Sequence, residues 1–293
     1  MIDKLEMFIA LAKERHFGRA AEAVGVTQPT LSSAIRQLEE TLGVQLVFRG
    51  SRFQGLTPEG ERVLDRAQRL VADARALREE MRAVRHGLVG TLRLGVIPTA
   101  LPRVAELTVP FLARNPDVRV TILSRTSSAI LAGIGSLDLD AGITYLDNEP
   151  LGRVTQVPLF RESYRLLVAA GAPLAGRASV SWAEVAAEPL CLLTGDMQNR
   201  RIVNELLTAA GVVAAPQVDS NSTIALAAHV ATGRWASVVP EALAAMFSRG
   251  GDLASVPITA PAVSHSVGLV APLREPYPPM LAALLEQAQR LAP

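Results

Sequence analysis

Cysteine is almost absent from this chain of 293 residues, since Cys191 is the only one. One cysteine cannot form an intramolecular disulfide, which excludes a disulfide-stapled secreted scaffold and fits a reducing compartment. Because Cys191 lies in the apolar stretch P-L-C-L-L, we expect a buried, inert thiol rather than a redox sensor. A thiol–disulfide switch within one chain would also need a second cysteine.

Long hydrophobic runs and a large net charge are missing as well. No stretch of about 18 apolar residues could cross a membrane, and the start, M-I-D-K-L-E-M-F, has no apolar signal core. We therefore expect a cytoplasmic protein without a membrane partner. The 29 basic and 28 acidic side chains leave a formal net charge of +1. This balance argues against indiscriminate nucleic-acid binding but allows a local DNA-contacting surface.

The common catalytic motifs are also lacking. There is no glycine-rich phosphate loop, no G-x-S-x-G elbow and no H-E-x-x-H. The four histidines are scattered along the chain and give no sign of a metal site. We therefore expect a protein that is not an enzyme and that holds no metal or cofactor.

The feature around which the chain is organised is a helix expected from Thr27 to Gly43. Thr27 can cap its start, Pro29 suits its first turn, and Gly43 ends it. Apolar residues at 31, 35, 38 and 42 form one stripe. The opposite face offers amide, hydroxyl and guanidinium groups and no acid, which suits base edges in a major groove. The residues expected at DNA on this helix are Thr27, Gln28, Pro29, Thr30, Ser32, Ser33 and Arg36.

The neighbouring segments complete a helix-turn-helix pattern. An amphipathic helix around 5–12 and a short helix over 17–25 precede the organising helix. Glycines and alternating apolar residues over 44–58 then predict a small hairpin, or wing, which carries the DNA-contact candidates Arg49 and Arg52 and no acid. The alternative is a helical arm that contacts only protein, with its arginines on a solvated face.

A long helix is expected from Pro58, after the cap Thr57, to about residue 88. About 29 residues at 1.5 Å each give a length of roughly 40 Å. Its apolar residues step by four and three without a break, which is typical of a heptad seam. We expect this seam to pair two copies of the chain, and the alternative is packing against its own chain. The seam consists of Val63, Ala67, Leu70, Ala74, Leu77, Met81, Val84 and Leu88.

The remaining residues alternate between strand and helix patterns, after a hinge expected at Gly87 and Gly90. Strands are expected near 91–98, 118–123, 140–145, 165–169, 190–193, 217–220, 236–239 and 265–270. Helices are expected at 101–114, 126–134, 200–209, 222–231 and 278–291, and a capping box starts another at Ser181. This alternation predicts a parallel sheet in two successive α/β halves.

The ends of the predicted strands carry neutral hydroxyl and amide groups. In parallel sheets, ligands bind beyond the carboxyl ends of the strands, near helix N-termini. This chemistry suits a small anion or a polar metabolite, although each residue alone could simply cap a helix. The candidate effector residues are Thr99, Ala100, Thr126, Ser128, Tyr145, Thr194 and Asn221.

The N-terminal block contains, in order, Ala20-Ala21, V-T-Q-P-T-L-S from Val26 and L-T-P-E-G from Leu56. With these residues it resembles the N-terminal block of LysR-type transcriptional regulators. Val47 stands where the family usually has Phe, and His16 where a small hydroxyl residue is common. Both departures concern packing rather than DNA contact. The resemblance implies that the helix over 27–43 enters the major groove and that the wing lies along the DNA backbone.

By this resemblance the fold is α+β and multidomain. It implies a winged helix-turn-helix domain over 1–58, a linker and dimerisation helix over 59–88, and a two-lobed, type 2 periplasmic-binding-protein-like effector domain over 89–293. Lobe 1 would span about 91–161 and 266–293, and lobe 2 about 162–265. The hydroxyl of Thr99 would contact the effector.

The resemblance also implies the partners of the chain. These are double-stranded operator DNA with inverted-repeat half-sites, a small-molecule effector, further copies of the chain in a dimer and tetramer, and RNA polymerase. We expect an anionic metabolite as effector, with regulators of formate dehydrogenase operons as the subgroup. The alternative is a small-molecule binding protein or enzyme of the α/β class with a helical arm that does not bind DNA.

Overall fold

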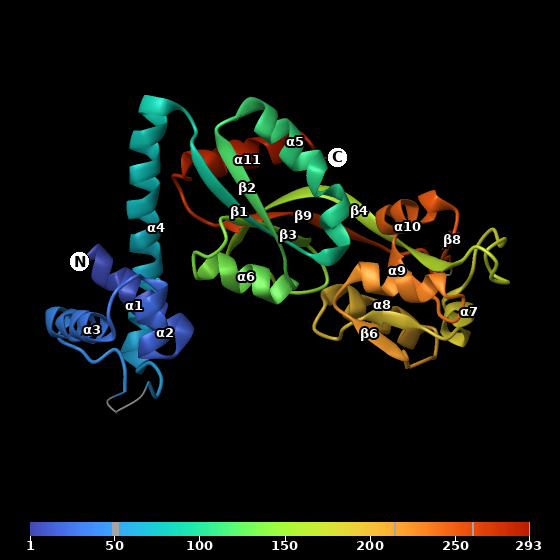
Figure 1. Cartoon of the computed structure of the whole chain (residues 1–293), viewed down its shortest axis with the longest axis horizontal. Helices are drawn as coiled ribbons and strands as arrows, with labels where there is room; N and C mark the ends of the chain where they lie inside the picture. The colour runs from blue at the N-terminus through green and yellow to red at the C-terminus, as the bar shows by residue number, and fades with distance from the viewer. Residues whose placement is uncertain (49–52, 214, 260, 293) are drawn as a thin grey trace. The chain divides into compact units, whose positions relative to one another are not determined.

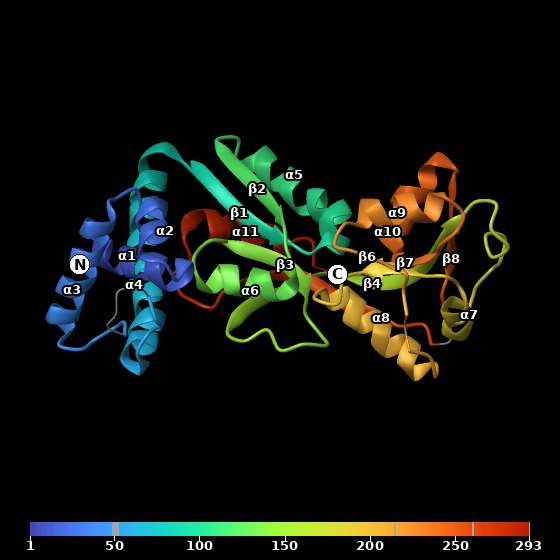
Figure 2. The same ribbon diagram turned by 60° about the horizontal axis from the view of Figure 1, so that its bottom comes forward.

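The computed structural model describes residues 1–48, 53–213, 215–259 and 261–292. They form two compact units. The first unit is built mainly on Met1–Val89, and the second on Gly90–Ile134, Leu139–Glu275 and the chain from Met280 onward. Figures 1 and 2 label the elements of both units in two views.

The first unit packs three short helices against the start of a long one. They are α1 (Ile2–Glu14), α2 (Phe17–Ala23), α3 (Gln28–Leu42) and α4 (Pro58–His86). The hydroxyl of Thr27 accepts a hydrogen bond from the backbone N–H of Thr30 at 3.4 Å, and Gly43 ends α3 in the left-handed region at φ 70°. Both ends of α3 match the prediction because capping signals act over a few neighbouring residues.

The core of this unit joins the apolar faces of all four helices. Phe8, Leu31 and Leu38 are fully buried in it. An exposed ion pair between Arg75 and Glu6, at 3.1 Å, adds a polar link between α4 and α1. The packed aliphatic faces therefore carry most of the stability of the bundle, because exposed ion pairs contribute little.

The two departures from the family pattern are both accommodated locally. The Nδ1 atom of His16 accepts a hydrogen bond from the backbone N–H of Arg19 at 3.2 Å, so the histidine caps α2 as a hydroxyl residue would. Val47 forms an antiparallel bridge with Leu56 and packs, half-buried, against the helical core. Neither residue disturbs the helix-turn-helix arrangement.

The second unit is an α/β domain. Its first part contains β1 (Gly90–Val96), the 3-10 helix η1 (Pro98–Arg103), α5 (Val104–Arg114), β2 (Val118–Ser124), α6 (Ser127–Gly135) and β3 (Ala141–Tyr145). Its middle part contains β4 (Val154–Ala169), α7 (Trp182–Ala187), β5 (Cys191–Leu193), α8 (Gln198–Ala209), β6 (Val218–Ser220) and α9 (Thr223–Ala231). Its last part contains β7 (Ser237–Pro240), α10 (Glu241–Phe247), η2 (Ser248–Gly250), β8 (Leu253–Pro257), β9 (Ser264–Pro272) and α11 (Pro279–Gln289).

The main sheet is mixed. Its strand order is β2-β1-β3-β9-β4-β7, with β8 also paired to β4. Strand β1 pairs in parallel with β2 and β3, whereas the pairs of β9 with β3 and β4, and of β4 with β7 and β8, are antiparallel. The prediction of a parallel sheet is therefore right for β1, β2 and β3, and also for the separate pair of β5 and β6, and wrong for the other strands of the main sheet. The other neighbouring strands of the main sheet run in opposite directions, and antiparallel neighbours can be joined without a helical crossover. A separate two-stranded sheet pairs β5 with β6 in parallel.

Strand β4 runs through two lobes of this unit. It pairs with β9 as far as Ser163 and with β7 from Tyr164 onward. In the first lobe, α5 and α11 lie on one face of the sheet and α6 on the other (Figures 1 and 2). The first half of β4 was not predicted, because Pro158 interrupts it at an irregularity in its pairing with β9. The two-lobed α/β domain that follows a winged helix-turn-helix and a long helix confirms the expected fold class.

Candidate functional site

The exposed face of α3 is the first candidate surface. Leu31, Ala34, Ile35 and Leu38 are buried on the opposite side of the helix. The predicted DNA-contact residues Thr27, Gln28, Pro29, Thr30, Ser33 and Arg36 are exposed, and Ser32 is half-buried at the edge of the face. The structure therefore brings these residues together on one polar surface.

Two kinds of side chain occupy this surface. The hydroxyls of Thr27 and Thr30 hydrogen-bond each other at 2.8 Å, and Ser33 accepts a hydrogen bond from Gln37 at 3.4 Å. Gln28 and Arg36 make no side-chain hydrogen bond to another described residue, so their amide and guanidinium groups are available to an external partner. An amide matches adenine and a guanidinium matches guanine in the major groove.

The carboxylate of Glu39 is used inside the motif. It accepts hydrogen bonds from the backbone N–H groups of Leu46, at 2.8 Å, and Val47, at 3.2 Å. This acid therefore ties the start of the wing to α3 instead of facing DNA. The close contact between the start of α4 and Leu46 requires glycine at position 60, because a Cβ atom there would lie 2.1 Å from the carbonyl oxygen of Leu46. The predicted wing contacts Arg49 and Arg52 lie outside the described residues.

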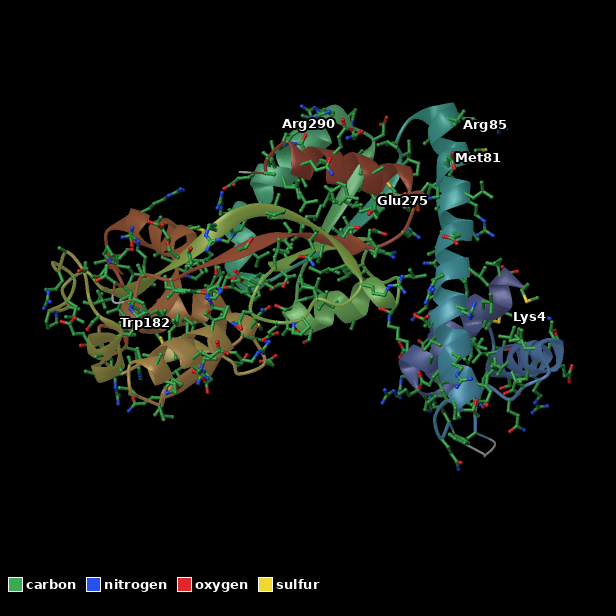
Figure 3. All side chains as sticks on the ribbon, turned by 180° about the vertical axis from the view of Figure 1, so that it is seen from behind. Lys4, Met81, Arg85, Trp182, Glu275 and Arg290 are labelled. Carbon is green, nitrogen blue, oxygen red and sulfur yellow. The ribbon has the colours of Figure 1, made fainter. Side chains whose placement is uncertain are left out.

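The predicted seam of α4 divides into two parts. Ala67 is buried and Val63 half-buried in the core of their own unit, so the first part packs within the chain. Further along, the side chains of Leu70, Leu77, Met81 and Val84 are between 52% and 78% exposed. Met81 lies near the end of the helix in Figure 3. Ala74 and Leu88 are half-buried.

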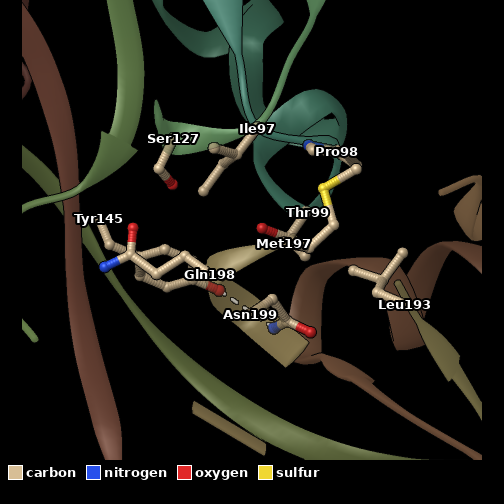
Figure 4. A pocket seen from close by; sticks show the side chains of 9 residues that line it. All are labelled: Ile97, Pro98, Thr99, Ser127, Tyr145, Leu193, Met197, Gln198 and Asn199. Carbon is tan, nitrogen blue, oxygen red and sulfur yellow. Dashed lines mark hydrogen bonds between the residues drawn. The ribbon is translucent and has the colours of Figure 1, made fainter. Parts of the chain in front are cut away.

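The second candidate site is a cavity between the two lobes of the α/β unit. The volume open to the centre of a water-sized molecule is about 10 Å³, within a depression of about 200 Å³ that includes open solvent. The lining residues are Ile97, Pro98, Thr99, Ser127, Tyr145, Leu193, Met197, Gln198 and Asn199 (Figure 4). The lining residues from Ile97 to Tyr145 belong to the first lobe, and the lining residues from Leu193 to Asn199 belong to the second. The inner space is enough for about one water molecule, so a ligand of several non-hydrogen atoms would also occupy the open part of the depression.

Two polar atoms of the lining lack a partner among the described residues. They are the hydroxyl oxygen of Thr99 and the side-chain oxygen of Gln198, and both residues are 2% exposed. The amide nitrogen of Gln198 donates to the backbone oxygen of Asp147 at 3.2 Å, which fixes its oxygen as a free acceptor. Because a buried polar atom without a partner is costly, these two atoms mark a place for a ligand or a water.

The hydroxyl of Tyr145 belongs to a buried chain of hydrogen bonds. It donates to the carboxylate of Glu162 and accepts from the side-chain amide of Asn199 at 3.1 Å (Figure 4 shows the latter). Burial raises the pKa of Glu162 to about 7, while the hydrogen bond from Tyr145 and the positive charge of Arg103 act in the opposite direction. Burial also raises the pKa of Tyr145 well above its usual value, so the phenol is protonated.

Of the predicted effector residues, Thr99 and Tyr145 line the cavity and five others do not. Thr126 caps α6 by accepting a hydrogen bond from the N–H of Ala129 at 3.1 Å, and Ser128 and Asn221 are exposed. Ala100 is buried, and Thr194 is half-buried, but neither lines the cavity. The helix-cap alternative therefore describes Thr126 correctly.

The sequence prediction missed Ser127, Met197, Gln198, Asn199 and Glu162. Ser127 accepts a hydrogen bond from Thr144 at 2.9 Å and begins α6, one residue beyond the predicted Thr126. Gln198 and Asn199 begin α8 just after β5, so the rule that ligands bind beyond strand ends could have found them. Glu162 gives no local signal, because only the pairing of β4 brings it behind Tyr145.

The charge of the cavity differs from the expectation of an anion site. None of the nine lining residues carries a formal charge, and the carboxyl group of Glu162 lies one hydrogen bond behind the wall. This arrangement weighs against a small anionic ligand. Elsewhere in the described chain there is no cluster of three metal-ligating side chains, and no helix there is long and apolar enough to span a membrane.

Comparison with known proteins identifies the class to which this architecture belongs. Residues 2–61 match the family described as "Bacterial regulatory helix-turn-helix protein, lysR family", and residues 85–293 match "LysR substrate binding domain". Together they cover a DNA-binding module and a ligand-binding module. The chain belongs to the LysR family of DNA-binding transcriptional regulators, whose members are not enzymes.

Three proteins illustrate the similarity. The DNA-binding transcriptional dual regulator OxyR of Escherichia coli K12 is 32% identical over 97% of this chain and 94% of its own length. The structure of a full-length OxyR variant from Pseudomonas aeruginosa has a TM-score of 0.77 and 29% identity, covering 100% of this chain and 95% of that one. The structure of a hydrogen peroxide-bound OxyR mutant from Corynebacterium glutamicum has a TM-score of 0.60 and 25% identity. The match covers 99% of this chain and 92% of that one.

These relatives correct one expectation from the sequence. The predicted formate dehydrogenase subgroup does not agree with these relatives, which are named OxyR or hydrogen peroxide-inducible genes activator. The N-terminal motif belongs to the whole family, so it does not distinguish between subgroups.

Proposed function

We propose that this LysR-family regulator binds operator DNA in a manner controlled by a small uncharged molecule in the inter-lobe cavity. One observation carries the proposal: Thr99 and Gln198 present a hydroxyl and a carbonyl oxygen that lack partners among the described residues. The free oxygen of Gln198 needs a hydrogen-bond donor, which an ionised carboxylate ligand does not have. The ligand class is therefore a neutral molecule with at least one N–H or O–H group.

The size of the cavity limits the affinity. The best small ligands gain about 1.5 kcal/mol per non-hydrogen atom, so a ligand of three such atoms reaches roughly −4.5 kcal/mol, a Kd near one millimolar. Hydrogen peroxide, with two such atoms, would bind roughly tenfold more weakly. A ligand of two or three such atoms would use the open part of the depression as well as the inner space.

A second candidate function is a response to hydrogen peroxide, which the names of the relatives favour. In this chain the response would have to proceed without a reactive thiolate. Cys191 is fully buried in β5, and burial raises the pKa of its thiol to about 11. Its thiol donates a weak hydrogen bond to the carbonyl oxygen of Leu226 at 3.7 Å. A thiol in this state reacts slowly with oxidants.

The DNA-bound form is proposed as an assembly in the cytoplasm. Two chains would pair through the exposed apolar residues of α4 and place two α3 helices at inverted-repeat half-sites. Gln28, Thr30, Ser33 and Arg36 would contact base edges, with the wing along the backbone. A pair of dimers would form a tetramer that contacts RNA polymerase. The Gly87–Gly90 hinge would transmit the change between the lobes to the paired helices.

The proposal is tested by ligand binding to the full chain. Formamide, urea and hydrogen peroxide serve as neutral probes in calorimetric titrations of the wild type and of Thr99→Val, which removes the hydroxyl and keeps the shape. Ser128→Ala, on the exposed start of α6, is the matched control. We expect at least one probe to bind the wild type and Ser128→Ala equally and Thr99→Val at least fivefold more weakly. Equal binding to all three proteins, or none to the wild type, would contradict the proposal.

A further inference from the structure

The wall of the cavity at Tyr145 can accept a hydrogen bond but has no proton left to donate. The single proton of the phenol points to the carboxylate of Glu162, and the N–H of Asn199 occupies one lone pair of its oxygen. Both partners are buried, at 5% and 4% exposure, so solvent does not compete for them. The direction of the tyrosine proton is therefore set by Glu162.

Little positive charge lies near the carboxylate of Glu162 to offset its negative charge at this side of the cavity. Among the described residues, Arg103 is the cation that acts on this carboxylate, and its guanidinium already binds Glu106 and stacks on the ring of Phe160. In a buried, weakly screened site, a second negative charge only two groups away is strongly disfavoured. The carboxylate can therefore act on a ligand that it never touches.

We propose that Glu162 determines the charge of the ligand: through Tyr145 it excludes anions from the cavity and favours neutral molecules that donate hydrogen bonds. This inference deepens the proposed function and rests on it, because it concerns the same cavity. Glu162 is a positioning residue in this account, since it acts through the hydroxyl of Tyr145. The cavity would thereby distinguish an amide from the carboxylate of the same shape.

The substitution Glu162→Gln has a specific expected effect. The new amide keeps the shape, loses the charge and can donate its own N–H to the oxygen of Tyr145. The phenol proton is then released from its present partner and can turn into the cavity, where it can donate to an anion. The variant should therefore accept a carboxylate that the wild type rejects.

Protonation of Glu162 should have the same effect in the wild type. The groups around its carboxyl are Tyr145 on β3, Tyr164 on β4, Asn199 on α8, Arg103 at the end of η1, and His265, which lies opposite it on β9 and is hydrogen-bonded to Asp147. An anion would bind together with a proton, so its apparent affinity should fall about tenfold per pH unit above the pKa of Glu162, which is about 7. Below that pH the affinity should level off.

The experiment compares formamide with formate, which have the same shape and differ in charge. Both are titrated calorimetrically into the full-length wild type, Glu162→Gln and the control Glu205→Gln, which removes a carboxylate from the exposed side of α8. At pH 8 we expect formate to bind Glu162→Gln at least tenfold more tightly than the wild type or the control. Formamide should bind all three within about threefold.

The pH dependence of formate binding to the wild type tests the inference without any variant. We expect the affinity to rise nearly tenfold from pH 9 to pH 8 and about fivefold from pH 8 to pH 7, and no such slope in Glu162→Gln. Equal formate affinity in the wild type and Glu162→Gln at pH 8, including no binding to either, would overturn the inference, as would a flat profile in the wild type. If formamide does not bind the wild type, the result counts against the cavity as a ligand site. This outcome is therefore distinguishable from a failure of the role proposed for Glu162.

Discussion

At the scale of single residues, Glu162 links the cavity to the stability of the fold. Its pKa is raised from 4.5 to about 7, so the folded chain holds a proton that the unfolded chain releases between these values. The stabilisation of the folded chain by this proton is therefore full below about pH 4.5 and is lost as the pH rises through 7. A shift of this size corresponds to roughly 3 kcal/mol.

We therefore expect the free energy of unfolding of the wild type to fall relative to that of Glu162→Gln between pH 5 and pH 8. The variant has no proton to lose at this position, so the difference between the two proteins isolates this group. Urea unfolding at several pH values measures it. Parallel stability profiles of the wild type and the variant would show that Glu162 titrates at an ordinary pKa in the folded chain.

Single residues also show which parts of the cavity could be predicted from the sequence. Thr99 and Tyr145 were predicted because Thr99 lies three residues after β1 and Tyr145 is the last residue of β3, and the rule on strand ends needs only local order. Glu162 could not be predicted, because its place behind Tyr145 depends on the register in which β4 pairs with β9. That pairing joins residues far apart in the sequence.

At the scale of elements, α3 carries the proposed recognition of DNA. Gln28→Ala and Arg36→Ala should each cost about 1–3 kcal/mol of specific binding if the side chain makes a bidentate contact with a base. Thr41→Ala is a suitable control, because Thr41 lies on the last turn, where its hydroxyl bonds to the carbonyl oxygen of Gln37. Gel shifts with the upstream region of the gene measure the effect. Unchanged affinity in both recognition variants would refute the assignment of this face to the major groove.

The elements differ in how far the sequence could define them. The boundaries of α3 and α4 were predicted closely because a capping threonine, an early proline and a final glycine act within one turn. Helix α10 and strand β8 were missed. Helix α10 has only seven residues, and β8 is defined by its pairing with β4. Elements held by tertiary pairing give weak local signals.

At the scale of the whole molecule, the exposed part of the α4 seam predicts self-association. Leu70→Asp combined with Leu77→Asp would place two charges in an apolar interface, where burial without a partner is costly. We expect sedimentation to show a shift from dimer to monomer, and operator affinity to fall because one winged helix reaches one half-site. Arg82→Asp changes the charge of the same helix away from the seam and should leave the dimer intact. A dimer that survives the double substitution would exclude this seam as the interface.

The central claim is that occupancy of the cavity changes how the protein lies on its operator. It is tested most directly by footprinting the upstream region of the gene with the wild type and Thr99→Val, with and without formamide at a concentration that saturates the wild type by calorimetry. We expect formamide to change the length of the region protected by the wild type and to leave that of Thr99→Val unchanged. Without formamide the two proteins should bind the operator within about twofold, because the cavity and the DNA surface are separate sites. Identical wild-type footprints with and without saturating formamide, or the same change in Thr99→Val, would contradict the account.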